Sequence, residues 1–183
     1  EAEIDPLAFN MPPSAKHLLG GDDVGRDVLS RLLYGGRVSL AVGIFSTAVS
    51  VIVGIPLGML AAFYRGAFEV VVMRLSDIFM SFPSTILILF LVSMFGPSII
   101  TVTVVIGVLG WPKFARQIYG SVLSIREKDY IEGAVAIGAK DKLIITRYIL
   151  PNAVAPIFIS ITFRIASAII LESSLSFLGM GVQ

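Results

Sequence analysis

The sequence predicts an all-α, polytopic membrane protein, and its composition and charge distribution support this class. Of the 183 residues, 56% are hydrophobic and 15% are charged, and the mean hydropathy is +0.90. A soluble domain carries about a quarter charged residues. The charges are also clustered, which leaves 27 uncharged residues from Val38 to Tyr64 and 35 from Ile78 to Pro112. Since about 20 apolar residues cross a hydrocarbon core of roughly 30 Å, both runs are long enough to span a membrane.

The same composition excludes several functions. A net charge of +1 provides no basic field for nucleic acid. The absence of cysteine excludes disulfides, thiolate catalysis and cysteine metal sites. One histidine and no phosphate-binding loop pattern leave no catalytic set, so we expect neither an enzyme nor a cofactor. His17 with Asp22, Asp23 and Asp27 suggests a metal site, but the irregular spacing favours helix capping and surface solvation.

The chain is expected to contain two regions. Residues 1–36 predict an extracytoplasmic segment of irregular polar backbone with one short interfacial helix over about 24–34, capped by Asp22 or Asp23. Residues 37–183 predict a transmembrane domain. Its four spanning helices are expected over about 38–63, 78–95 with an amphipathic start upstream, 99–119 and 153–178. Lys and Arg gather in the loops between the first two helices and between the last two, so these loops should face the cytoplasm.

The loop over about 121–151 is too polar to span and too apolar to be a loose linker. We expect two short helices in it, one over about 128–137 that ends at a left-handed Gly138, and one over about 140–149. Pro151 suits the first turn of the following span. The small residues of the first short helix would let a groove of another protein close on it. The alternative is a loop that packs only against its own helices.

These residues resemble a known family. Glu132-Gly133-Ala134, Gly138 and Leu150-Pro151 have the spacing of the EAA signature of permease subunits in bacterial ABC importers, E-A-A-x3-G-x9-I-x-L-P. Gly133 replaces the first alanine, and Tyr148 occupies the isoleucine position. The stretches PPSAKHLLGGDDVGRDVLSRLLYGGRVSL and GWPKFARQIYGSVLSIREKDYIEGA, with the late LSFLGMGVQ, are similar to the C-type subunit of dipeptide, oligopeptide and nickel permeases.

The resemblance implies a type I ABC importer permease core with four of six spanning helices, so we expect this sequence to be a fragment. It implies import of di- or oligopeptides across the cytoplasmic membrane of a prokaryote, without nucleic acid. The implied partners are a second homologous permease, two ATPase subunits that hydrolyse the ATP, an extracytoplasmic binding protein and the lipid bilayer. Import of a nickel chelate is the alternative within the family. An intramembrane enzyme and a passive channel are the alternatives from other classes.

In these importers a short cytoplasmic helix of the EAA loop sits in a cleft of the ATPase. The resemblance therefore implies that the motif residues couple the permease to closure of the ATPase. These residues are Glu132, Gly133, Ala134, Gly138, Leu150 and Pro151. Within it, we expect Glu132 to orient the loop by local hydrogen bonds, Gly133 and Ala134 to allow close packing, and Gly138 to act as the bend.

Two charged residues fall inside the last predicted span. A lone arginine such as Arg164 costs about 2.5–3.5 kcal/mol at mid-bilayer, so it should face protein or water. Arg164 and Glu172 are therefore candidates for the translocation pathway. The alternatives are a salt bridge between helices, or an arginine that extends to the membrane surface.

Overall fold

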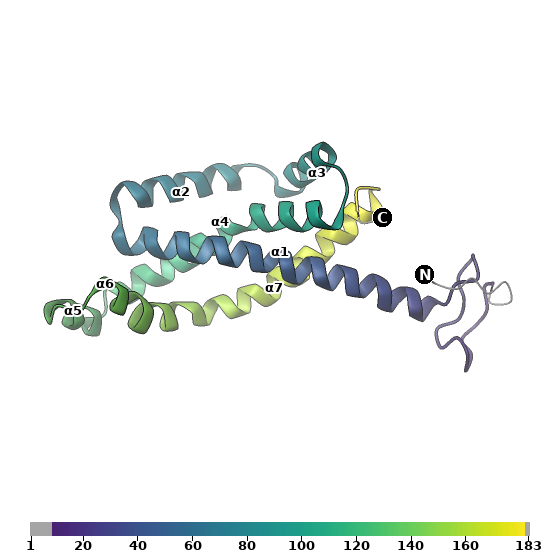
Figure 1. Ribbon diagram of the computed structural model, residues 1–183, viewed down its shortest axis with the longest axis horizontal. Helices are drawn as coiled ribbons and strands as arrows, with labels where there is room; N and C mark the ends of the chain where they lie inside the picture. The colour runs from purple at the N-terminus through teal and green to yellow at the C-terminus, as the bar shows by residue number, and fades with distance from the viewer. Residues whose placement is uncertain (1–8, 182–183) are drawn as a thin grey trace. The chain divides into compact units, whose positions relative to one another are not determined.

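The computed structural model describes residues 9–181, and helices make up most of this range (Figure 1). The elements are α1 (Val28–Tyr64), α2 (Gly66–Ser81), α3 (Ser84–Phe95), α4 (Ile99–Arg126), α5 (Asp129–Ala136), α6 (Asp141–Leu143), the π-helix η2 (Ile144–Ile149) and α7 (Leu150–Phe177). Within the described range there is no strand, only one isolated bridge between Gly21 and Asp27. The chain forms two compact units, residues 1–41 and 42–183.

In the first unit, two aspartates organise the loop before α1. The Asp22 carboxylate accepts hydrogen bonds from the amides of Val24 and Arg26, at 2.9 and 2.8 Å, and pairs with Arg31. The Asp27 carboxylate accepts from the Ser30 amide at 2.8 Å, where it caps α1, and lies 3.1 Å from Nδ1 of His17. Capping is thus performed by Asp27 rather than by Asp22 or Asp23, and no metal-binding group of side chains is found in residues 9–181.

The loop before α1 should lose its hydrogen bonds to Asp22 and Asp27 at low pH. The hydrogen bond from the Arg26 amide is the main cause that holds the pKa of Asp22 below its usual value, and bonds from Ser30, followed by His17, do the same for the pKa of Asp27. A depressed pKa contributes stability above the unfolded value of about 3.9, and this stability is lost as pH falls through the folded value. We expect the exchange protection of the Val24 and Arg26 amides to stay constant from pH 7 to about 4. It should then decline at lower pH, as measured by hydrogen exchange in detergent.

The helix over about 24–34 that we expected to be separate does not occur. The helix α1 begins at Val28 and is assigned without interruption to Tyr64, through Gly35 and Gly36. Glycine lowers helix propensity by about 1 kcal/mol but keeps its N–H group, so a glycine pair does not by itself end a helix.

The second unit contains the close crossing of α1 and α4. A Cβ atom at Gly58 would lie 2.1 Å from the Ala115 carbonyl oxygen, and one at Gly54 would lie 2.6 Å from that of Trp111. The Ser50 hydroxyl donates to the Gly107 carbonyl at 2.7 Å. The small residues of α1 therefore allow the two helices to approach closely, because backbone meets backbone at these positions.

The second predicted span is broken. The helices α2 and α3 meet at an angle of 87°, because Phe82 adopts an extended conformation before Pro83. In contrast, Pro56, Pro112 and Pro156 lie inside uninterrupted helices. Three described helices are long and apolar enough to cross a membrane, namely Val28–Tyr64, Ile99–Arg126 and the continuous run Asp141–Phe177. The predicted count of four is reached only if the bent α2–α3 pair forms one span.

Two separate clusters form most of the core of the second unit. One joins α5 to the adjacent ends of α1, α4 and α7 through residues that include Ala62, Ile118, Ile131 and Ile149. The other joins α3, the first turns of α4 and the last turns of α7 through Val92, Val102, Leu175 and their neighbours. The α1–α2 junction and α5 therefore lie at one end of this unit, and the α3–α4 turn lies at the other (Figure 1).

Candidate functional site

The short helix α5 has one attached face and one free face. Ile131 and Ala134 are buried in the core cluster at its end of the unit. On the free face, the exposed side chains include Tyr130 at 48%, Val135 at 59% and Ile137 at 86%. The helix thus does pack against the chain's own helices, as the alternative held, but only through Ile131 and Ala134. The apolar free face is available for another protein.

Two expectations for the motif residues differ from the structure. Ala134 allows close packing, but against the chain's own helices rather than against a partner. The Glu132 side chain is exposed and, within residues 9–181, makes no hydrogen bond or ion pair, so it does not orient the loop locally. Gly133 is exposed, and nothing lies within 4 Å of the position of a Cβ atom there. Glu132 and Gly133 are therefore both free to meet a partner.

The bend after α5 occurs where it was predicted. Gly138 has a φ of +78°, the left-handed conformation that favours glycine. The amide of Ala139 donates to the Ala134 carbonyl and that of Gly138 to the Val135 carbonyl, which ends the helix. The following helix differs from the prediction, because the π-turns of η2 connect α6 directly to α7. Leu150 and Pro151 form the first turn of α7, so α6, η2 and α7 form one continuous helical run from Asp141 to Phe177.

Arg164 lies halfway along α7 and reaches across to α4. Its Nη2 donates to the Ile106 carbonyl at 2.8 Å. A Cβ atom at Gly110 would lie 2.5 Å from this Nη2, so the glycine makes room for the guanidinium. The Arg164 Nε is buried and has no hydrogen-bond partner in the described part of the chain. An unsatisfied buried donor of this kind costs about 1–3 kcal/mol.

A hollow of about 320 Å³ lies between α4 and α7 beside this arginine. Lys113, Phe114 and Gln117 line it from α4, and Ser160, Phe163, Arg164 and Ser167 line it from α7. Sequence reasoning found only Arg164 among these residues. The i, i+4 spacing of Lys113 and Gln117 in α4 is a signal that could have placed both on one face.

Glu172 lies two turns further along α7 and is not part of this hollow. It is 4% exposed, and its carboxylate accepts a hydrogen bond from the Ser176 hydroxyl at 2.8 Å. The described partners of the two residues therefore differ, since Arg164 bonds to the Ile106 carbonyl and Glu172 to the Ser176 hydroxyl.

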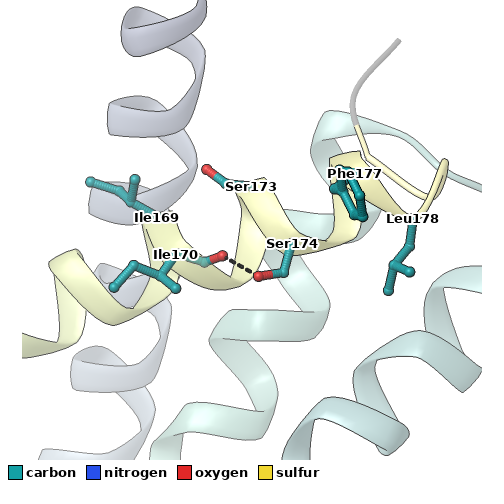
Figure 2. A pocket seen from close by; sticks show the side chains of 6 residues that line it. All are labelled: Ile169, Ile170, Ser173, Ser174, Phe177 and Leu178. Carbon is teal, nitrogen blue, oxygen red and sulfur yellow. Dashed lines mark hydrogen bonds between the residues drawn. The ribbon is translucent and has the colours of Figure 1, made fainter.

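A second hollow, of about 540 Å³, follows the C-terminal part of α7 alone (Figure 2). It is lined by Ile169, Ile170, Ser173, Ser174, Phe177 and Leu178. The Ser174 hydroxyl donates back to the Ile170 carbonyl of its own helix. The lining is mainly apolar and contains no charged side chain, so this hollow suits apolar packing rather than binding of a charged group.

The sequence matches the profile of a known family. The family described as binding-protein-dependent transport system inner membrane component matches residues 54–183. The chain belongs to this family of permeases. The matched range includes α5, Gly138 and both candidate pathway residues, so the family assignment covers the whole of the candidate site.

Curated permeases resemble the chain over its full length. It is 41% identical over 183 residues to the glutathione transport system permease protein GsiD of Pectobacterium atrosepticum, and covers 61% of that protein. It is 38% identical over 182 residues to the dipeptide transport system permease protein DppC of Alkalihalophilus pseudofirmus, of which it covers 60%. The chain thus spans about three fifths of the length of these relatives.

A solved permease structure has the same fold. The match is to a chain of the MetNI methionine ABC transporter in inward-facing conformations, with a TM-score of 0.72 and 22% identity. It covers 84% of this chain and 77% of the other. This confirms the predicted all-α, multi-pass fold of an ABC transporter permease.

Proposed function

We propose that this chain forms the translocation core of a permease subunit in an ATP-driven importer of di- or oligopeptides. The observation that carries this proposal is α5, a short helix fixed to the spans by Ile131 and Ala134 while Val135 and Ile137 remain exposed. The names of relatives, which include dipeptide and glutathione transport, support a peptide cargo.

The proposed mechanism needs a separate ATPase. The exposed face of α5 enters a cleft of an ATPase subunit, and closure of the cleft moves α5. Because η2 joins α6 to α7 without a break, the movement reaches the spanning helix and changes access to the pathway. A conformational change is driven only if docking differs in free energy between the two states, and a cleft that closes on a rigid helix provides this difference.

The proposed assembly follows the family. A second homologous permease pairs with this subunit, two ATPase subunits bind from the cytoplasm, and a binding protein delivers peptide from outside. In this arrangement α5 and the basic α1–α2 junction face the cytoplasm of a prokaryote, and the segment before α1 faces outward. Hydrolysis of ATP belongs to the ATPase subunits, and the permease itself is not an enzyme.

Uptake in proteoliposomes tests the proposal. The complete transporter, with binding protein outside and ATP inside, should accumulate labelled dialanine, and omission of ATP should abolish uptake. Equal flux without ATP would support a passive channel instead. Accumulation of a nickel chelate without peptide uptake would favour the alternative cargo.

Gly138 offers a sharper test of coupling. A valine there must adopt a φ of +78°, which costs about 1–2 kcal/mol, although no atom lies within 4 Å of its Cβ. We expect Gly138→Val to tilt α5 relative to α6 and to reduce peptide-stimulated ATP hydrolysis several-fold. Asparagine tolerates the left-handed conformation, so Gly138→Asn should retain the stimulation. Full stimulation in the valine variant would remove the bend from the mechanism.

A further inference from the structure

The hollow between α4 and α7 contains positive charge without a counter-ion. Lys113 and Arg164 both line it, and no aspartate or glutamate is among its lining residues. Neither cation forms an ion pair anywhere in residues 9–181, whereas the nearby Arg116 pairs with Asp77. Charge in a spanning region is costly unless it is paired or faces water. An anionic group entering the hollow would therefore be attracted to it.

The arginine is also held in position to bind such a group. One nitrogen, Nη2, is fixed by the Ile106 carbonyl, and Nε is buried without a partner in the described chain. A guanidinium is planar, and its pairs of N–H donors match the two oxygens of a carboxylate. Because the hydrogen bond to Ile106 already restricts the side chain, less conformational entropy is lost on binding than for a free arginine.

The remaining walls suit a peptide. The Nε2 of Gln117, a lining residue, donates to the Pro156 carbonyl at 3.3 Å, and the amide oxygen of the same side chain is a hydrogen-bond acceptor. Phe114 and Phe163 provide apolar surface on the two helices. The volume of about 320 Å³ is within the range of small-molecule sites.

From these observations we propose that the α4–α7 hollow is a carboxylate subsite for the transported peptide. Arg164 binds the C-terminal carboxylate, Lys113 contributes a second positive charge, and Gln117 accepts from an N–H group of the peptide. The subsite rests on the proposed function. The subsite extends the proposed function, because it assigns recognition of a free carboxylate to the permease itself. Glutathione and dipeptides, which relatives are named for, share this group.

The test compares dialanine with its C-terminal amide, which lacks the carboxylate. The complete transporter is reconstituted in liposomes, and both peptides are supplied above the concentrations that saturate the binding protein, as determined by calorimetry. We expect Lys113→Gln and Arg164→Gln each to lower ATP-dependent uptake of dialanine about tenfold, the usual effect of one lost charged hydrogen bond. Uptake of the amide should change less than twofold. Arg74→Gln removes an exposed arginine of α2 outside the hollow and should leave both rates unchanged.

Other outcomes overturn the subsite. Unchanged ratios of dialanine to amide uptake in both variants would show that the hollow does not recognise the carboxylate. An equal loss for both peptides, with loss of assembly on a sizing column, would show that the cations pair with a carboxylate of the neighbouring permease. The Lys113 side chain is exposed and makes no hydrogen bond or ion pair within residues 9–181, so Lys113→Gln tests the subsite even if Arg164→Gln does not fold. Failure of the wild-type transporter to take up either peptide would instead refute the proposed function.

Discussion

Replacing Gly58 by alanine is expected to destabilise the membrane domain strongly, although it adds only one methyl group. The new Cβ would lie 2.1 Å from the Ala115 carbonyl oxygen and 2.5 Å from Cγ2 of Ile118. The isoleucine can rotate, but the carbonyl belongs to the backbone of α4 and can retreat only if the two helices separate. Overpacking of this kind costs about 1–3 kcal/mol, and a clash with backbone belongs at the upper limit.

Thermal unfolding in detergent measures this effect. A loss of about 3 kcal/mol should lower the midpoint by roughly 10 °C for a chain of this size. Gly120→Ala is the matched control, because Gly120 lies in α4, the other helix of the crossing, and nothing is within 4 Å of its added Cβ. Alanine there should keep or raise the midpoint, since it is the better helix former by about 1 kcal/mol. Equal midpoints for the two variants would contradict the close crossing of α1 and α4.

Composition was sufficient to predict which parts of the chain form apolar helices, but not where these helices end or that the second one is bent. The uncharged runs lie in α1, α3 and α4, as expected. However, α4 continues to Arg126, well beyond the expected end near Tyr119. Hydropathy predicts where the apolar residues end, whereas the helix itself extends as far as its side chains pack against other parts of the chain. Val122 is fully buried against the cluster that holds α5, which stabilises these additional turns.

The sequence also did not show which prolines interrupt a helix. Pro83 lies at the break between α2 and α3, but Pro56, which also lies in an uncharged run, does not interrupt α1. Each proline removes one backbone hydrogen bond, and whether the chain bends depends on what the flanking turns pack against. That information lies in the tertiary contacts, not in the local residues.

The candidate site was only partly predictable, because some of its features are local in the sequence and others depend on tertiary contacts. The bend at Gly138 has a local signature, since a left-handed helix end favours glycine. The partner of Arg164 has none, because it is the backbone carbonyl of Ile106 and any residue could supply it. Lys113 and Gln117 meet Arg164 only through the packing of α4 on α7, which a single sequence does not specify.

Replacing Ile137 by serine is expected to weaken docking of the ATPase, and so to lower peptide-stimulated ATP hydrolysis, while the permease remains folded. Ile137 is 86% exposed at the end of α5, so serine removes almost no contact within the chain. If this side chain is buried in the ATPase cleft, its loss costs about 1.5–3 kcal/mol of docking free energy. Peptide-stimulated ATP hydrolysis by the assembled complex should then fall by about tenfold or more.

A second isoleucine provides the control for this variant. Ile100 is 75% exposed in the first turn of α4, which lies at the opposite end of the unit from α5. Ile100→Ser makes the same chemical change with the same small loss of internal packing, but at the end opposite the proposed ATPase contact. It should therefore preserve both ATPase binding in a pull-down and the stimulated activity. If the two serine variants behaved alike, the exposed face of α5 would not be the ATPase contact, and a mechanism in which α5 transmits cleft closure through η2 to α7 could not operate.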